Sequence, residues 1–533
     1  MSTESQVFPR QRNSRFGSSW VQPVTEITPE TIECFAIENL CARVWPAPTV
    51  FFPLQDDDDS ISLFTKLAQG LARLLYRYPV LAGRLKSDHR GACRIEILPA
   101  PHAGTQFFFA DLSGDHDFPS FEELQKSNFP YADGDSDGLR ALRPDPFALE
   151  RDGHSPFISQ LSRVQGGHIL TFAFSHQVAD MVMYRGIVET WARETLEVSK
   201  AKLQGRPISP MPPSLWRELS DRARFPAQKA KPRDTDGAMN TSRVLPLWIL
   251  VDPTILSTLE DMGSIIPLAY LPPAPSQVEI NQRVPITGIW RFSRAIVKDL
   301  QQSISSISQG QIRLSSMDIL TAFLWERFVT AKYMLSRSDA TSRVPPKSSS
   351  IVFALDIRRR VDPPLPDQYL PACVDLARCS APLATEDNRL NTIASMAEKI
   401  RKANETWNEE DHKSMLALTR SAPVSPGVVP RGPIDLLVTD HSRIPEVVSS
   451  DWGQGLGVPV AVREPYLGRS IPTGEITILP RRPNGDLEVM VCGERIVLER
   501  LERDAEFARR AKLLFLQHDV VAGCRKRRMR QRL

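Results

Sequence analysis

The sequence predicts an α/β protein in which a sheet covered by helices is used twice. At 533 residues the chain is too long for one ordinary core, so we expect two to four domains. Each half alternates strand-like and helix-like segments, and residues 206–285 between them are rich in proline with little periodicity. We therefore predict an N-terminal domain over residues 1–225, a crossover linker over 226–285 and a C-terminal domain over 286–533.

The first half contains a strong helix pattern. Residues 60–77, "SISLFTKLAQGLARLLYR", place apolar side chains at three- and four-residue spacing, with Ser60 as the expected N-cap. The acidic run Asp56–Asp59 precedes this segment, where the helix macrodipole favours negative charge. A divalent-metal site at these aspartates is the alternative.

A strand-to-helix turn follows further along the first half. After a turn in "YPVLAGRL", the segment 169–174 is rich in β-formers and predicts a strand. A helix is expected to begin at about Tyr184. Because reacting groups often sit at such turns, His176 and Asp180, which lie between strand and helix, are candidate site residues.

The second half also reads as sheet plus helices. Ser315 and Asp318 have capping-box spacing before a helix over 319–334. The stretch 348–360, "SSSIVFALDIRRR", predicts a strand, and 474–494 predicts a hairpin with its turn at "NG". Residues 500–523 are expected to form one closing helix. In the linker, "VLPLWILVDP" is apolar enough to pack on a domain.

Composition and charge exclude several classes of protein. A net charge of +3 gives no argument for a nucleic-acid partner. The sequence contains no run of 18 apolar residues, so we expect no membrane span. The N-terminus lacks the apolar core of a secretory signal, so we expect a cytoplasmic protein. The basic C-terminal tail is expected to be solvated and frayed, with a nuclear-localisation or nucleic-acid role as the alternative.

The pattern of cysteines indicates a reducing compartment and gives no indication of a metal site. All seven are scattered singly, without a C-x-x-C pair, which is typical of thiols buried as small hydrophobes. No cysteine or histidine cluster has zinc-ligand spacing, so we expect no metal site.

The pair in "SHQVAD" suits general-base chemistry. A base that deprotonates an alcohol needs a neutral imidazole nitrogen facing the substrate, and its ring must be held in place. Asp180 is expected to hold the turn that presents His176, either directly or through an arginine. The simpler alternative is a buried polar pair at the end of a strand. No serine or cysteine stands in a nucleophile-elbow pattern, which favours direct transfer over a covalent enzyme intermediate.

A second candidate is the glycine-rich loop "SSDWGQGLG", residues 449–457. Glycines at alternate positions permit positive φ angles or close backbone approach. A phosphate-binding loop is the alternative, but neither GxGxxG nor GKS is present. We expect a structural turn.

Together the two stretches resemble the HxxxD and DFGWG motifs of the BAHD-type acyltransferases. The resemblance is to their fungal branch in particular, the trichothecene 3-O-acetyltransferase-like transferases. Further family-like stretches occur in the family's order: "YPVLAGRL", "SSMDILTAFLW", "LDIRRRVDPPLPDQYL" and "VTDHSRIP". They span about residues 78–507, and their joint order is more specific than any one of them.

The resemblance implies a fold and a reaction. The fold would be two chloramphenicol-acetyltransferase-like domains, each a mixed sheet with helices, with the active-site tunnel between them. His176 would be the general base for transfer from an acyl-CoA, acetyl-CoA first, to a hydroxyl of a small secondary metabolite. No resident cofactor is implied, since acyl-CoA is a co-substrate, and we expect a monomer.

The resemblance also assigns supporting residues. Asp180 would point away from the substrate and pair with Arg358. The glycine loop would be structural and remote from the chemistry, through Asp451, Trp452, Gly453 and Gly455.

Four positions depart from the family pattern. Met181 stands where a glycine usually follows HxxxD, and Pro371 replaces another common glycine. Trp452 and Gln454 replace the phenylalanine and tryptophan of DFGWG. These changes bear on loop shape and on the substrate pocket, and none removes the base.

Three alternatives remain open from the sequence. A carrier-protein-dependent condensation enzyme shares HxxxD but usually has a second histidine just before it, where this chain has Ser175. A thioester hydrolase would release its product to water. A catalytically silent small-molecule-binding protein of the same fold would not need His176 and Asp180 intact.

Overall fold

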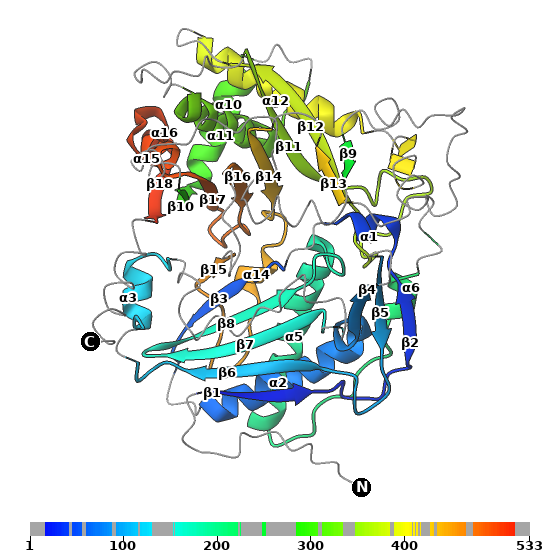
Figure 1. Ribbon diagram of the computed structural model, residues 1–533. Helices are drawn as coiled ribbons and strands as arrows, with labels where there is room; N and C mark the ends of the chain where they lie inside the picture. Colours follow the sequence, from blue (N-terminus) through cyan, green and yellow to red (C-terminus); the bar gives the residue numbers. More distant parts are fainter. Residues whose placement is uncertain are drawn as a thin grey trace, which may run out of the picture.

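The chain is described here by a computed structural model. It describes residues 16–41, 45–55, 60–87, 92–115, 118–130, 153, 155–221, 224, 248–251, 284–307, 312–333, 347–383, 388–407, 409–410, 412–413, 416, 427–430, 434–464 and 473–517. Two large mixed sheets, each with its own helices, dominate these residues (Figure 1). This confirms the predicted α/β arrangement used twice.

The first sheet lies in the lower half of Figure 1 and is built mainly from the N-terminal half of the chain. Its β6–β7 pair is parallel and its other neighbours are antiparallel. The strand predicted over 169–174 is confirmed within β8, which is buried along its whole length. In spatial order the strands are β1 (Phe16–Val21), β6 (Thr105–Asp111), β7 (Phe157–Val164), β8 (Gly167–Phe174), β3 (Thr49–Pro53) and β15 (Ala461–Arg463).

Two long helices, α2 (Ser60–Arg77) and α5 (Met181–Leu203), pack on each other and on this sheet (Figure 1). Trp191 of α5 is fully buried, and its indole N–H donates to the carbonyl oxygen of Leu67 at 3.0 Å. The predicted helix over residues 60–77 is confirmed. The acidic run Asp56–Asp59 lies outside the described residues.

Helix α5 begins at Met181, three residues before the predicted start. The Asp180 carboxylate caps it by accepting from the backbone N–H groups of Val182 (3.0 Å) and Met183 (3.4 Å). The capping oxygen satisfies N–H groups that have no partner within the helix. The earlier helix start was missed because Asp180 was interpreted as a site residue and not as an N-cap.

The second sheet lies in the upper half of Figure 1 and is built from the C-terminal half of the chain. Its β11–β14 and β14–β16 pairs are parallel, and its other neighbours are antiparallel. The predicted strand and hairpin of this half are confirmed. In order the strands are β12 (Val374–Pro382), β11 (Ser348–Asp356), β14 (Leu436–Asp440), β16 (Glu475–Ile478), β17 (Leu487–Glu494), β10 (Pro285–Phe292) and β18 (Lys512–Leu516).

The helices of the second half include the predicted capped one. Asp318 accepts from the Ser315 backbone at 2.7 Å, and Ser315 Oγ accepts from the Asp318 backbone at 3.2 Å, which confirms the capping box. These helices are α10 (Arg294–Ser305), α11 (Ser316–Tyr333), α12 (Arg389–Glu405), α15 (Arg495–Arg503) and α16 (Ala505–Arg510).

The single closing helix predicted over 500–523 is wrong. Asp504 has non-helical backbone angles and starts α16 by accepting from the Phe507 backbone at 2.7 Å, so the helix is interrupted. The chain then forms β18, which pairs with β10. Leu514 and Leu516 are buried at alternate positions, which suits a strand at the edge of the sheet better than a helix.

Smaller elements complete the described chain. The linker segment predicted to pack on a domain contributes β9 (Trp248–Val251), which pairs with β13 (Gly427–Pro430). A small sheet joins β2 (Glu30–Glu33), β5 (Cys93–Ile97) and β4 (Arg84–Ser87). The short helices are α1 (Ala36–Leu40), η1 (Pro79–Ala82), α3 (Phe121–Lys126), α6 (Trp216–Leu219) and α14 (Glu446–Ser449).

One segment of the second half crosses to the first sheet and returns. After β14 the chain forms α14 beside α5, and then β15, which pairs with β3 (Figure 1). It next re-enters the second sheet at β16. We call residues 441–464 the crossing segment. The domain boundaries at 225 and 285 stay predictions, and this segment places part of the predicted C-terminal domain on the first sheet.

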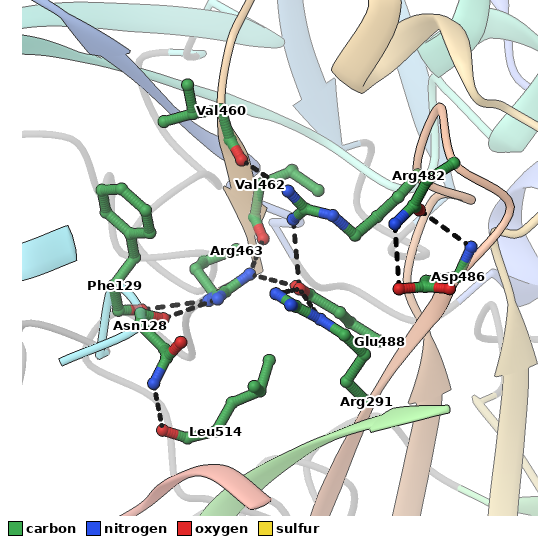
Figure 2. Close-up of polar contacts among 11 residues, drawn as sticks. Asn128, Phe129, Arg291, Val460, Val462, Arg463, Arg482, Asp486, Glu488 and Leu514 are labelled. Carbon is green, nitrogen blue, oxygen red and sulfur yellow. Dashed lines mark hydrogen bonds and ion pairs between the residues drawn. The ribbon is translucent and has the colours of Figure 1, made fainter. Parts of the chain in front are cut away.

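A buried ionic cluster fastens the crossing segment to both halves (Figure 2). Arg463, at the end of β15, donates to Glu488 of β17 at 2.7 Å and to the carbonyl oxygens of Asn128 and Phe129. Arg291 donates to the same carboxylate. Because the Arg463 and Glu488 side chains are 2% and 3% exposed, the two sheets are joined here by a desolvated pair.

Candidate active site

His176 lies in the turn between β8 and α5. The turn is shaped by backbone hydrogen bonds from Val178 and Ala179 to the Ser175 carbonyl oxygen, at 3.0 and 3.1 Å. Within Ser175–Asp180, every residue except His176 is buried, and His176 is partly exposed. The fold therefore buries the turn and leaves His176 as its one partly exposed residue.

Asp180 is occupied by groups other than His176. One carboxylate oxygen caps α5, as described above. The other accepts from Arg358 Nη2 at 2.6 Å and from the Cys373 backbone N–H at 3.0 Å. Because four donors share these two oxygens, the carboxylate holds the turn between the two halves of the molecule.

Arg358 is equally well satisfied. Its guanidinium donates to the backbone carbonyl oxygens of Tyr369 (2.7 Å) and Pro371 (3.0 Å) and to the Asp356 carboxylate (3.0 Å), besides Asp180. Burial works against its charge, but the nearby carboxylates, above all Asp180, outweigh it and raise the pKa of Arg358. A buried pair of this kind fixes geometry more than it adds net stability.

The structure thus brings Asp180 and Arg358 together, as the resemblance implies. It also explains why the departures at Met181 and Pro371 are tolerated. Met181 is the first residue of α5 and has no positive φ angle, so glycine is not required there. Pro371 supplies a carbonyl oxygen, which proline retains.

Two thiols lie in the electrostatic field of this pair, and the sequence did not single them out as site residues. Burial, with a contribution from the Asp180 carboxylate, raises the pKa of the Cys41 thiol. Burial likewise raises the pKa of the Cys373 thiol, although Arg358 opposes it. Since the thiolate is the nucleophilic form, neither cysteine is suited to carry an acyl group.

The glycine loop packs on the hydrophobic core of the first sheet and its two long helices, which we call the first core. Trp452 is fully buried, with its ring centroid 5.6 Å from that of Trp191 and 6.0 Å from that of Phe52. Gly453 has a φ angle of 88°, and a Cβ there would lie 2.8 Å from Ser199 Oγ. Gly455 has a φ angle of 96°. Positive φ angles favour glycine at both positions.

The polar members of the loop act locally. The Asp451 carboxylate accepts from the Gly453 backbone at 2.9 Å, which closes the turn. Gln454 is exposed, and its backbone carbonyl oxygen accepts from Lys66 Nζ at 3.4 Å. A glutamine in place of the family's tryptophan therefore disturbs no core packing.

The loop is far from His176 along α5. Gly453 approaches Leu196, which follows Asp180 by sixteen residues of continuous helix. At a rise of 1.5 Å per residue this corresponds to about 24 Å along the helix axis. A catalytic contact between the loop and the histidine turn is excluded by that separation.

A second imidazole, absent from the sequence-based candidates, contacts the first turn of α5. It belongs to His441. His441 Nδ1 is 2.9 Å from Glu464 Oε1, and the His441 ring packs edge to face with Tyr184 at 6.1 Å. The sequence signal was weak, since His441 stands in "VTDHSRIP" without the aspartate four residues later that marks His176. Only the fold brings Glu464 to it.

Neither metal ligands nor a membrane span are found in the described part of the chain. No group of three or more histidine, cysteine or acidic side chains there is arranged to hold a metal ion. None of the helices described is both long and apolar enough to cross a bilayer.

Comparison with protein families gives two matches that together cover most of the chain. Residues 47–193 match the family model described as the trichothecene 3-O-acetyltransferase-like N-terminal domain. Residues 272–508 match the model of the Transferase family. The first match contains the histidine turn, and the second contains Arg358 and the glycine loop.

Characterised relatives are similar over nearly their full length. Acyltransferase easC of Emericella nidulans is 26% identical over 498 residues, covering 91% of this chain and 95% of that protein. Trichothecene 3-O-acetyltransferase TRI101 of Fusarium sporotrichioides is 22% identical over 488 residues, covering 87% and 93%.

Solved structures share the fold. TRI101 of F. graminearum, in complex with coenzyme A and deoxynivalenol, superposes with a TM-score of 0.66 at 16% identity, covering 91% of this chain and all of that one. Vinorine synthase superposes with a TM-score of 0.56 at 14% identity, covering 93% and 98%. The expected two-domain acyltransferase fold is thereby confirmed.

Proposed function

Since the chain belongs to the trichothecene 3-O-acetyltransferase-like family of acyltransferases, we propose that it moves an acyl group from an acyl-CoA to a hydroxyl of a small secondary metabolite. Acetyl-CoA is the donor we favour, because relatives are named O-acetyltransferases and TRI101 was solved with coenzyme A. The acceptor class follows from deoxynivalenol and T-2 mycotoxin in those structures. We also propose that the chain acts as a monomer in the cytoplasm.

His176 is the general base. It accepts the proton of the acceptor hydroxyl, and the oxygen attacks the thioester carbonyl carbon. The C–O bond forms, the C–S bond breaks, and the leaving CoA thiolate takes the proton back from His176. The observation that carries this assignment is that His176 alone within Ser175–Asp180 is not buried.

Asp180 and Arg358 are positioning residues. All four donors to Asp180 come from α5, from Arg358 or from the backbone at Cys373, so its carboxylate fixes the turn that presents the imidazole. Asp451, Trp452, Gly453 and Gly455 hold the crossing segment on the first core. They take no part in the chemistry.

Transfer is direct, without an acyl-enzyme. The thiols nearest the buried pair, Cys41 and Cys373, are held neutral by burial. The reaction needs no resident cofactor or metal, because the thioester is already activated and its thiolate is a good leaving group. Donors that stabilise the oxyanion are required, and losing one costs about 3 kcal/mol in well-studied enzymes.

The test is acyl transfer from deuterium-labelled acetyl-CoA to a panel of hydroxylated metabolites that includes deoxynivalenol. Mass spectrometry follows the labelled ester, and a thiol reagent follows release of CoA. A labelled ester with stoichiometric CoA release supports the proposal. Release of CoA with labelled acetate as the only product makes the protein a hydrolase. Binding of acetyl-CoA without turnover makes it a silent binding protein.

A further inference from the structure

The two ends of the crossing segment are joined to each other, and we call this junction of His441 and Glu464 the neck. The segment leaves the second sheet at His441 and returns toward it after Glu464, and these two side chains are joined at 2.9 Å although 23 residues separate them. The backbone N–H of His441 donates to the Ile478 carbonyl oxygen at 2.8 Å, which ties the neck to β16. The His441–Glu464 pair therefore links the point where the chain leaves the second sheet to the end of the strand it adds to the first.

The neck rests on the helix turn that follows His176. The His441 ring packs edge to face with the ring of Tyr184, which lies in the first turn of α5. The Tyr184 backbone donates to the Asp180 carbonyl oxygen at 2.8 Å. The Tyr184 ring also packs on Phe174, two residues before His176, with 5.5 Å between the ring centroids. The neck and the histidine turn thus share one aromatic side chain.

A second contact fixes the same region. Arg185, next to Tyr184, pairs with Glu446 of α14 at 2.8 Å. Tyr184 and Arg185 therefore both contact the crossing segment, the first through His441 and the second through Glu446. Any loosening of the neck acts on the first turn of α5, and through Asp180 on the position of His176.

The two residues that end the crossing segment differ in chemistry. Arg463 pairs with Glu488 (Figure 2), and an arginine keeps its charge at every physiological pH. Glu464, its neighbour, pairs with a histidine, whose charge changes near neutrality. One attachment is permanent, and the other varies with protonation.

Several charged groups face His441. Glu464 approaches from the end of β15, Asp440 from β14 and Glu475 from β16, while the phenol of Tyr184 approaches from α5. Burial would lower the pKa of His441, but the three carboxylates outweigh it and raise that pKa above its ordinary value. The protonated ring is thus the form that these neighbours stabilise.

We propose that the His441–Glu464 pair is a positioning element for the catalytic turn, which it holds in the productive place when His441 is protonated. The protonated ring forms an ion pair with Glu464, and loss of the proton leaves a weaker hydrogen bond between a neutral ring and the carboxylate. His441 is a positioning residue and does not touch the reacting atoms. The effect on rate rests on the proposed acyl transfer, whereas the effect on the turn does not.

Two variants separate charge from shape. Glu464→Gln keeps an acceptor for the His441 ring but removes the anion. His441→Asn keeps a side-chain N–H near the position of Nδ1 and cannot be protonated. The matched control is His412→Asn, because His412 is another histidine paired with a carboxylate, Asp375, at 2.8 Å, but that carboxylate lies in β12 of the second sheet.

The primary readout is amide hydrogen exchange of the peptide from His176 to Arg185, compared with wild type at the same pH. The contribution of a raised histidine pKa is fully present below the unfolded value of about 6.5 and is lost as pH rises through the folded value. We therefore expect Glu464→Gln and His441→Asn to exchange several-fold faster than wild type at pH about 6. The difference should narrow as pH rises through the folded pKa of His441, and His412→Asn should match wild type throughout.

The second readout is the pH profile of kcat for acetyl transfer. Wild type should lose activity on an alkaline limb that moves down by about one unit in Glu464→Gln and disappears in His441→Asn. Unchanged exchange and an unmoved limb in Glu464→Gln would overturn the proposal, even if His441→Asn failed to fold. If wild type proved inactive with every acceptor, the proposed function would fail while the exchange comparison would still decide this inference.

Discussion

The carboxylate of Asp180 lies 2.6 Å from the guanidinium of Arg358, although 178 residues separate them in the chain. Both side chains are 1% exposed. Asp180 belongs to the turn after β8 of the first sheet, and Arg358 follows β11 of the second. A buried ion pair therefore ties the histidine turn to the opposite half of the molecule.

Replacing His176 with alanine should abolish turnover while the fold survives. The side chain is partly exposed and belongs to no element of the core, so its loss removes the base and leaves little cavity. Initial rates of acetyl-CoA turnover and thermal unfolding should be measured together. A variant that kept the wild-type rate would show that another group accepts the proton.

Replacing Asp180 with alanine should reduce both activity and stability. The change leaves Arg358 buried without its carboxylate and removes the cap of α5, and breaking a buried pair typically costs about 3–5 kcal/mol. Urea unfolding and kcat are the measurements. The matched control is Asp367→Ala, which removes the exposed partner of the neighbouring Arg359 and should change stability little. Normal melting and activity of Asp180→Ala would remove its positioning role.

Replacing Trp452 with alanine should destabilise the protein without changing kcat per folded molecule. The ring fills a buried site against Phe52 and Trp191, and truncation of such a side chain costs about 3–5 kcal/mol. Since the loop contacts α5 far from the histidine turn, the chemistry should persist. Gln454→Ala is the control, because Gln454 is exposed and contributes only its carbonyl oxygen to Lys66. A fall in kcat at full folding would place the loop in the reaction.

Replacing Glu488 with glutamine should weaken the fold at neutral pH and matter less in acid. Burial would raise the pKa of Glu488, but Arg463, Arg482 and Arg291 outweigh it and lower that pKa. Stability from a lowered carboxyl pKa is present above the unfolded value of about 4.3 and is lost as pH falls through the folded value.

The expected cost of this change is about 1–3 kcal/mol at pH about 7, since the buried guanidinium of Arg463 then faces a neutral amide and loses its counter-charge. Urea unfolding of wild type and variant across the acidic range checks it. The two curves should converge as pH falls. A difference that stayed constant with pH would mean that packing, and not charge, fastens the crossing segment.

Much of the fold was readable from local patterns. The helix over residues 60–77 and the capping box of Ser315 and Asp318 appeared as predicted, because each depends on side chains within a few positions of one another. The closing helix failed at Asp504, where a cap interrupts a sequence that is otherwise helix-like. Beyond it, pairing with β10 outweighs the local preference of Lys512–Leu516.

The class of fold, the family motifs and the residue types at the histidine turn could be read before folding, because helix periodicity, capping and motif order are properties of neighbouring residues. The folded chain was needed to show that Asp180 pairs with Arg358, that Cys373 contributes a backbone donor and that His441 meets Glu464 beside Tyr184. Those contacts join segments from different sheets. Their partners are selected by burial and by the geometry of the folded chain, which no spacing along the sequence records.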